Sequence, residues 1–367
     1  MKTKLMKLLS VTLAITMLLC LSLPAGAASA FDDDAYASIV TGSDFQYSHD
    51  AAYDRFANVL SLMKADGLET PHSMLVGGDY TRMLFDDAAP GIARIKDDMT
   101  GIYPDMDEND VICIQGNHDN PSAGFTKTGF HDMGAYCLYS INEDDFPWLQ
   151  YLKPTMKAKI KKLAADIESK LNAMIDSGDT RPAIVLTHVP LHHTDRAYGG
   201  DNKYASYIFD VLNEAGKKLD VIFLFGHNHS DPYDDYIGGS VNFLQAGDEI
   251  RIPDPNKLSK TEYISRTLNF TYLNCGYIGY SGNTVSDTST NVLTIGCIRL
   301  GSDHIRFIKY SEDGLYSVKE VARITSGGDG TASESSSFRN AALWNIIRNL
   351  FNKFAFLMKF FFAINLY

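Results

Sequence analysis

Short apolar runs alternate with amphipathic segments along most of this chain, and five of the apolar runs share an unusual ending. Each passes into polar side chains that can bind metals or move protons. Uninterrupted apolar runs are typical of strands buried on both faces. Because the carboxyl ends of parallel strands lie at one edge of a sheet, we expect the five polar clusters to meet there. The runs and their endings are Ala37–Val40 before Asp44 and Gln46, Met74–Val76 before Gly78-Asp79, Val111–Ile114 before Gly116-Asn117-His118-Asp119, Ala183–Leu186 before His188, and Val221–Phe225 before Gly226-His227-Asn228-His229.

Apolar side chains at helical spacing separate these strands. One amphipathic helix is predicted around Phe56 and ends near Gly67, and a long one runs from Met156 to about Gly178. Shorter helices are predicted over 86–99 and 204–215. Strand and helix therefore alternate as they do in a doubly wound α/β sheet.

After about Gly239 the pattern changes to strands separated by turns. Hairpin signals stand at Gly301-Ser302-Asp303 and Glu312-Asp313-Gly314, so these strands are expected to be antiparallel. A second sheet of this kind, packed on the first, would make a sandwich. The predicted strands are Val241–Leu244, Asn269–Leu273, Tyr277–Tyr280, Val292–Leu300, His304–Tyr310 and Tyr316–Arg323.

The beginning of the chain differs in composition from its body. Residues 1–30 combine three lysines, an apolar run and a stretch of small residues, which is typical of a secretory signal cleaved after Ala27 or Ala30. The body covers 31–325, and the Ser- and Gly-rich residues 326–337 predict a flexible linker. We therefore expect a secreted or extracellular protein.

Residues 338–367 predict a basic amphipathic helix. Arg348, Lys353 and Lys359 interrupt the apolar residues too often for a plain membrane span, and they share one side of a helical wheel. A helix of this kind lies in a bilayer interface, where anionic lipids attract its basic side chains. A helix packed on its own domain or on a partner would show the same pattern. The first interpretation predicts association with the cell surface or membrane.

The body of the chain is strongly acidic. Three of the 33 basic residues lie in the predicted signal and four in the tail, so the 26 that remain face 45 acidic residues and leave a net charge near −19. Such a body repels nucleic acid, and no nucleic-acid polymer is expected as a partner. It suits multivalent cations, although a solvated acidic surface would have the same charge without any site.

The cysteines predict no disulfide framework. Cys20 lies in the predicted signal, and the four others have a spacing typical of no known framework. Export permits disulfides, but buried thiols are expected at Cys113, Cys137, Cys275 and Cys297.

The polar strand endings hold the donor types that a pair of divalent cations requires. Such a centre needs one carboxylate shared by both ions and neutral donors that complete each shell, and Asp79 is the natural shared ligand. His118 would then stand above the ions, oriented by Asp119 and able to protonate a leaving oxygen. The other donors form one set of Asp44, Gln46 and His229 and a second set of Asn117, His188 and His227.

The ordered motifs Asp-x-Gln, Gly-Asp, Gly-Asn-His-Asp, His and Gly-His-x-His resemble those of the calcineurin-like metallophosphoesterase superfamily, over about Ile39 to Ser230. The resemblance implies a four-layer αββα sandwich, with 31–325 as the catalytic domain. It also implies hydrolysis of small phosphate mono- or diesters by a hydroxide between two metal ions. Carried over by position, Asp44, Gln46, Asp79, Asn117, His188, His227 and His229 take the ligand roles, and His118 becomes the general acid.

One position departs from the family pattern. The first motif usually ends in His, and here it ends in Gln46. An amide can bind a cation through its oxygen, which is a harder donor than imidazole, so the substitution favours Mn²⁺ or Fe over Zn²⁺. It also predicts weaker binding of the first metal.

A second hypothesis is a non-catalytic surface or scaffold protein that keeps the fold and a metal. The altered first motif favours it, whereas His118 beside Asp119 argues for catalysis. Each motif alone could be an ordinary turn or strand end. His192 and His193 are expected near the site without binding metal, and pocket residues are predicted at Tyr47, Tyr80, Arg196, Tyr198 and Tyr233. Nucleotides, lipid headgroups and cell-wall phosphodiesters are all compatible substrates.

Overall fold

The computed structural model describes the body of the chain with gaps. The described residues are 31, 33–46, 50–81, 86–121, 124–147, 155–192, 202–228, 243–256, 262–276, 278, 294–312, 314–328 and 330–333. The predicted signal and the predicted C-terminal helix lie outside them. So do several residues expected near the site, namely Tyr47, His193, Arg196, Tyr198, His229 and Tyr233.

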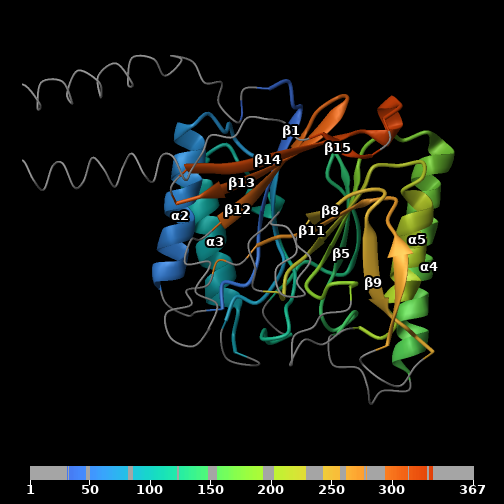
Figure 1. Cartoon of the computed structure of the whole chain (residues 1–367). Helices are drawn as coiled ribbons and strands as arrows, with labels where there is room; N and C mark the ends of the chain where they lie inside the picture. The colour runs from blue at the N-terminus through green and yellow to red at the C-terminus, as the bar shows by residue number, and fades with distance from the viewer. Residues whose placement is uncertain are drawn as a thin grey trace, which may run out of the picture.

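Two large mixed sheets form the centre of the protein (Figure 1). The first has the order β15-β14-β13-β12-β1-β2-β3, and the second has the order β4-β5-β6-β7-β11-β8. Strands of the first sheet are β1 (Ala37–Gly42), β2 (Ser73–Val76), β3 (Val111–Cys113), β12 (Thr294–Leu300), β13 (His304–Ser311), β14 (Gly314–Ala322) and β15 (Ala332–Ser333). Strands of the second are β4 (Gly129–Asp132), β5 (Cys137–Ile141), β6 (Ala183–Thr187), β7 (Val221–Phe225), β8 (Phe243–Leu244) and β11 (Thr271–Asn274). A separate hairpin pairs β9 (Glu249–Pro253) with β10 (Tyr263–Thr267).

Helices cover the outer face of each sheet. In Figure 1, α2 (Asp50–Ala65) and α3 (Ala89–Ile102) lie on one side, and α4 (Met156–Ser177) and α5 (Ala205–Ala215) lie on the other. The helical spacing of apolar residues predicted α2, α4 and α5 correctly. Helix α4 ends where Gly178 takes a left-handed conformation with φ 71°, which costs a glycine little. Two single 3-10 turns, η1 (Glu108–Asp110) and η2 (Ile324–Ser326), complete the helical elements of the described residues.

The core has three apolar layers because consecutive strand residues face opposite ways. Val40 packs under α2 and α3, whereas its neighbour Ile39 packs between the sheets. In the second sheet, Val185 packs under α4 and α5, and Ile184 faces the first sheet. Strands buried on both faces have no polar alternation, which explains the apolar runs of the sequence. The four-layer αββα sandwich is thereby confirmed.

Several sequence predictions need correction. The helix predicted over 86–99 begins at Ala89, because Asp86 instead pairs with Asp119 in a β-bridge. The later strands do not form a sheet of their own. Strands β12, β13 and β14 extend the first sheet from β1, whereas β8 and β11 join the second. Strand β11 is parallel to β7, and not antiparallel as expected, because the chain passes through β8 and the β9–β10 hairpin before it returns.

The predicted linker begins inside the folded body. Residues 324–326 form η2, and Ala332 and Ser333 form β15, which pairs with β14. Their Ser and Gly content therefore reflects tight turns, such as the left-handed Gly327, rather than a flexible segment over its described part.

The predicted state of the cysteines can be compared directly. Cys113, Cys137, Cys275 and Cys297 are buried free thiols, as predicted. Within the described ranges, no helix combines the length and the apolar character that a membrane crossing requires.

Candidate metal centre

The polar strand ends meet between the two sheets. Asp44, Asp79 and Asn117 follow β1, β2 and β3 of the first sheet, whereas His188 and His227 follow β6 and β7 of the second. The prediction of a single sheet edge was wrong because β3 is an edge strand and β12 occupies the other side of β1, so later strands form a new sheet. The carboxyl ends of the two parallel groups nevertheless lie together.

The backbone at this junction is strained. Four non-glycine residues among those described have positive φ, and all four are predicted ligands: Asp44 (55°), Gln46 (37°), Asp79 (58°) and His227 (68°). Such conformations are unfavourable for residues with a Cβ atom and cluster at functional sites. They turn each side chain back from its strand end toward the space between the sheets.

Close backbone packing makes this arrangement possible. A Cβ atom on Gly116 would lie 2.2 Å from Asp79 Oδ1, and one on Gly226 would lie 2.8 Å from Asp44 Oδ2. Any larger residue would therefore displace a predicted ligand. The glycines of the Gly-Asn-His-Asp and Gly-His-x-His motifs are required by this contact.

Four buried donor atoms form a compact group. Asn117 Oδ1 lies 2.8 Å from both His188 Nε2 and His227 Nδ1, and these two nitrogens are 3.3 Å apart. Asp79 Oδ2 lies 3.4 Å from His188 Nε2. Ligands that share an ion at about 2.0 to 2.1 Å are themselves about 2.8 to 3.4 Å apart in octahedral or tetrahedral geometry. The donor set of carboxylate, amide oxygen and two imidazoles thus fits a divalent cation.

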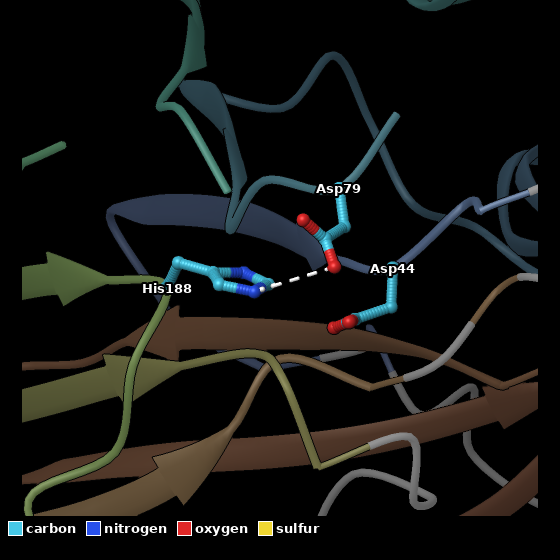
Figure 2. A group of neighbouring side chains, drawn as sticks. All are labelled: Asp44, Asp79 and His188. Carbon is cyan, nitrogen blue, oxygen red and sulfur yellow. Dashed lines mark ion pairs between the residues drawn. The ribbon is translucent and has the colours of Figure 1, made fainter. Parts of the chain in front are cut away.

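Electrostatics tie His188 to Asp79 (Figure 2). Burial alone would lower the pKa of His188, but the Asp79 carboxylate raises it to about 10. Burial would raise the pKa of Asp79, yet the charges of His188 and His118 hold it below its ordinary value. His188 Nδ1 also lies 2.7 Å from the carbonyl oxygen of Gly77. An Nδ1–H bond there leaves Nε2 directed at the site.

Asp44 and Gln46 approach the same group from β1. Asp44 Oδ2 accepts a hydrogen bond of 2.9 Å from the backbone N–H of His227 in the other sheet. Gln46 Nε2 donates a hydrogen bond of 2.8 Å to Asp79 Oδ2. Ligand atoms of Asp44, Asp79 and His188 all lie within 4.8 Å of one another. The structure therefore gathers every described member of the predicted ligand set.

His118 lies at the open side of the centre. Its side chain is 25% exposed, its Nε2 is 3.9 Å from Asp79 Oδ2, and its backbone N–H donates to Asp79 Oδ1 at 2.9 Å. The imidazole is thus beside the predicted shared ligand and accessible to a substrate.

Asp119 is placed differently from the orienting role expected of it. Its carboxylate accepts hydrogen bonds from the backbone N–H groups of Gly116, Asp79 and Tyr80, at 2.8, 2.9 and 2.9 Å. Burial, together with the Asp79 carboxylate, raises the pKa of Asp119 to about 7. These bonds join the loop after β2 to the loop after β3, which suits a positioning role.

A corresponding arrangement supports the ligand loops of the second sheet. The hydroxyl of Tyr272 on β11 accepts hydrogen bonds from the backbone N–H groups of Leu191 and His192, at 2.8 and 3.2 Å, and lies 2.8 Å from His192 Nδ1. On the other side of the ring, His192 Nε2 lies 3.2 Å from Asn228 Nδ2. His192 therefore lies between Tyr272 and the loop that carries His227.

Two tyrosines show what sequence reasoning missed. Tyr272 stood only in a predicted strand, and no sequence signal marked its hydroxyl. Tyr80 was predicted to line a pocket, but it is 1% exposed and stacks on Phe45 in the core under α2 and α3. Its position next to a ligand could not reveal which way the side chain points.

Comparison with known sequences shows the family of this chain. The sequence model of the calcineurin-like phosphoesterase family matches residues 39–231. The chain belongs to the calcineurin-like phosphoesterase family.

Three solved structures are similar to this chain at low sequence identity. A dimetal phosphatase from Danio rerio is 10% identical with a TM-score of 0.47, and the match covers 76% of this chain and 96% of that one. A predicted phosphoesterase from Streptococcus pneumoniae is 11% identical with a TM-score of 0.31, covering 78% and 98%. Vps29 of Entamoeba histolytica complexed with Zn²⁺ is 10% identical with a TM-score of 0.32, also covering 78% and 98%. No curated protein matches the sequence.

Proposed function

We propose that this protein is an exported, metal-dependent phosphoric ester hydrolase that acts on small phosphate mono- or diesters. The observation that carries the proposal is the convergence of Asp79, Asn117, His188 and His227 on one point, with the imidazole of His118 beside it. Family membership supports the same reaction class.

The residues that would hold two divalent cations divide between the sheets. Asp79 would be shared by both ions. Asn117, His188 and His227 would complete the ligand set of one ion, and Asp44, Gln46 and the predicted ligand His229 that of the other. Oxygen donors at Gln46 and Asn117 favour Mn²⁺ or Fe, and Zn²⁺ is compatible with the imidazoles. When bound, the ions polarise and neutralise phosphoryl oxygens and supply the nucleophile.

The protein side chains would position the substrate and move one proton. His118 is accessible and is anchored to the Asp79 carboxylate through its backbone N–H, so its Nε2–H can reach a leaving oxygen above the centre. Asp119 would keep the ligand loops after β2 and β3 in register, and the Tyr272 hydroxyl would hold the loop after β6. Burial of the donor atoms excludes water from the ligand side of the centre.

The test compares hydrolysis of a chromogenic aryl phosphate by wild type and His118→Ala in the presence of Mn²⁺. We expect metal content to stay unchanged and kcat to fall by about 10²- to 10⁴-fold. The control is His304→Ala, a 49% exposed histidine on β13, which should leave kcat unchanged. Metal binding without hydrolysis in the wild type would support the scaffold alternative. Equal kcat in wild type and His118→Ala would remove the acid role.

Export and membrane association rest on residues 1–30 and 338–367, which lie outside the described part of the chain. We propose that the first segment directs secretion and that the second binds anionic lipid surfaces. Removal of 338–367 should then release the protein from anionic vesicles in a sedimentation assay. Continued co-sedimentation of the truncated protein would contradict the second assignment.

A further inference from the structure

We propose that the metal centre of this chain is asymmetric. The group formed by Asp79, Asn117, His188 and His227 would bind one divalent ion tightly, and Gln46 would keep the adjoining position weak, so that it fills only at higher free metal concentration. The inference rests on the proposed function, since it concerns the affinity of the same site. Its consequence is an enzyme whose activity responds to the supply of metal.

The tight position has a complete set of pre-arranged donors. Its four donors come from both sheets, are each at most 8% exposed, and lie 2.8 to 3.4 Å from their neighbours in the group. His188 is further fixed by the carbonyl oxygen of Gly77. A pre-arranged set of donors binds an ion without first ordering its side chains.

Two ions would share one carboxylate oxygen of Asp79. Asp79 Oδ1 accepts the backbone N–H of His118 at 2.9 Å, whereas Oδ2 is the oxygen directed at His188 and the tight position. Asp79 Oδ2 faces His188 on one side, and on the other it accepts the amide N–H of Gln46 at 2.8 Å. That hydrogen bond takes the lone pair that a second ion would need.

Gln46 is held in this position through both its backbone and its side chain. Its backbone N–H donates to the carbonyl oxygen of Asp79 at 3.0 Å, while its side-chain amide reaches the carboxylate of the same residue. Because a carboxylate accepts hydrogen bonds, the amide nitrogen must face it. To bind an ion through its oxygen, Gln46 must turn its amide and give up a charge-assisted bond. This competition should weaken the adjoining position by about 10- to 100-fold.

Histidine at the same place would act differently. An imidazole offers an sp² nitrogen lone pair to a cation and needs no amide rotation to do so. Gln46 therefore donates a hydrogen bond to the shared carboxylate of Asp79. A histidine at this position would instead complete the ligand set of the second ion. The structure thus gives a physical reason for the departure from the family pattern.

The experiment is a titration of the metal-free full-length protein with Mn²⁺, followed by calorimetry and low-temperature electron paramagnetic resonance. We expect one tight ion with an isolated six-line spectrum, then a second ion at least tenfold weaker, with exchange coupling only at high Mn²⁺. Gln46→His should bring the two affinities closer by about tenfold and produce the coupled spectrum at two equivalents. Gln46→Leu should bind the first ion and lose the second.

The control is Gln245→His, which adds a histidine directly after β8. Gln245 lies toward the amino end of β11, and the ligands follow the carboxyl ends of the parallel strands. Its two affinities should match those of wild type. Two equally tight ions in wild type, or an unchanged second affinity in Gln46→Leu, would overturn the asymmetry and leave the proposed hydrolase intact. Failure of wild type to bind any ion would instead refute the proposed function.

Discussion

At the scale of single residues, strain marks the site more sharply than residue type does. Aspartates and histidines occur throughout the chain, but only Asp44, Gln46, Asp79 and His227 combine a side chain with positive φ among the described residues. Each such conformation costs roughly 1 to 3 kcal/mol, and the surrounding hydrogen bonds must offset that cost. The motifs predicted which residues converge. They could not predict the strain, because φ depends on contacts between loops that are distant in sequence, such as that of the His227 N–H with Asp44.

Asp119 provides a prediction at this scale. Asp119→Ala removes the acceptor shared by three backbone N–H groups, so the ligand loops after β2 and β3 should separate. We expect Mn²⁺ affinity to fall by about 10- to 100-fold and the free energy of unfolding to fall by about 2 to 3 kcal/mol. Calorimetric titration and urea unfolding measure these two quantities.

Asp119→Asn distinguishes positioning from orientation of His118. The amide keeps one acceptor oxygen, so most of the metal affinity should return. If Asp119 acted only on His118, both variants would bind Mn²⁺ like wild type and only the rate of hydrolysis would change. Unaltered metal affinity in Asp119→Ala would therefore show that the loops are held by other contacts.

At the scale of secondary structure, the sequence predicted the helices and strands themselves better than it predicted which strands pair. The bounds of β7 and of α4 followed from apolar runs and helical spacing, since both signals are local. Strand β4 was missed because it is a short edge strand with alternating exposure that includes His131 and Asp132. The partners of β11 and β12 depend on where the chain crosses between sheets, and no local pattern records that crossing.

Tyr272 connects strand β11 to the loop that follows the ligand His188. Tyr272→Phe removes the hydroxyl that holds the backbone of Leu191 and His192 but keeps the ring stacked on Phe223 and Phe225, at centroid distances of 5.2 and 4.7 Å. The free energy of unfolding should fall by about 1 to 2 kcal/mol. Mn²⁺ affinity should fall by roughly tenfold, because the loop that follows His188 loses its support.

The matched control for this prediction is Tyr139→Phe. Its hydroxyl donates to Asp166 of α4 at 2.6 Å, in the middle of β5 and away from the strand ends. The control should also lower the free energy of unfolding but leave Mn²⁺ affinity unchanged. A Tyr272→Phe protein that binds Mn²⁺ as tightly as the control does would contradict the coupling between β11 and the metal centre.

At the scale of the whole molecule, the two ends of the first sheet have separate tasks. The carboxyl end of β1 carries the metal centre. The amino end is tied down by Asp33, which binds Arg299 of β12 and Arg306 of β13, while Phe31 is buried on Tyr310. These contacts begin directly after the predicted signal, so either predicted cleavage point, after Ala27 or Ala30, leaves them intact.

Acid unfolding tests that anchor. Burial raises the pKa of Asp33, but the guanidinium groups of Arg299 and Arg306 outweigh it and hold the pKa below its ordinary value. A depressed pKa in the folded state stabilises the protein at pH values above the unfolded pKa of about 3.9. The stabilisation is lost as the pH falls through the lower, folded value.

Asp33→Asn should therefore lower the free energy of unfolding by about 1 to 3 kcal/mol at pH 7, because Arg299 is 6% exposed and loses its charged partner. The difference from wild type should shrink as the pH falls below about 4, where the carboxylate is protonated first in the unfolded chain and then, at lower pH, in the folded protein. Urea unfolding at several pH values measures it, with the exposed Asp34→Asn as control. A difference that stays constant down to acid pH would show that Asp33 acts through shape and not through charge, and that the anchor is not an ion pair.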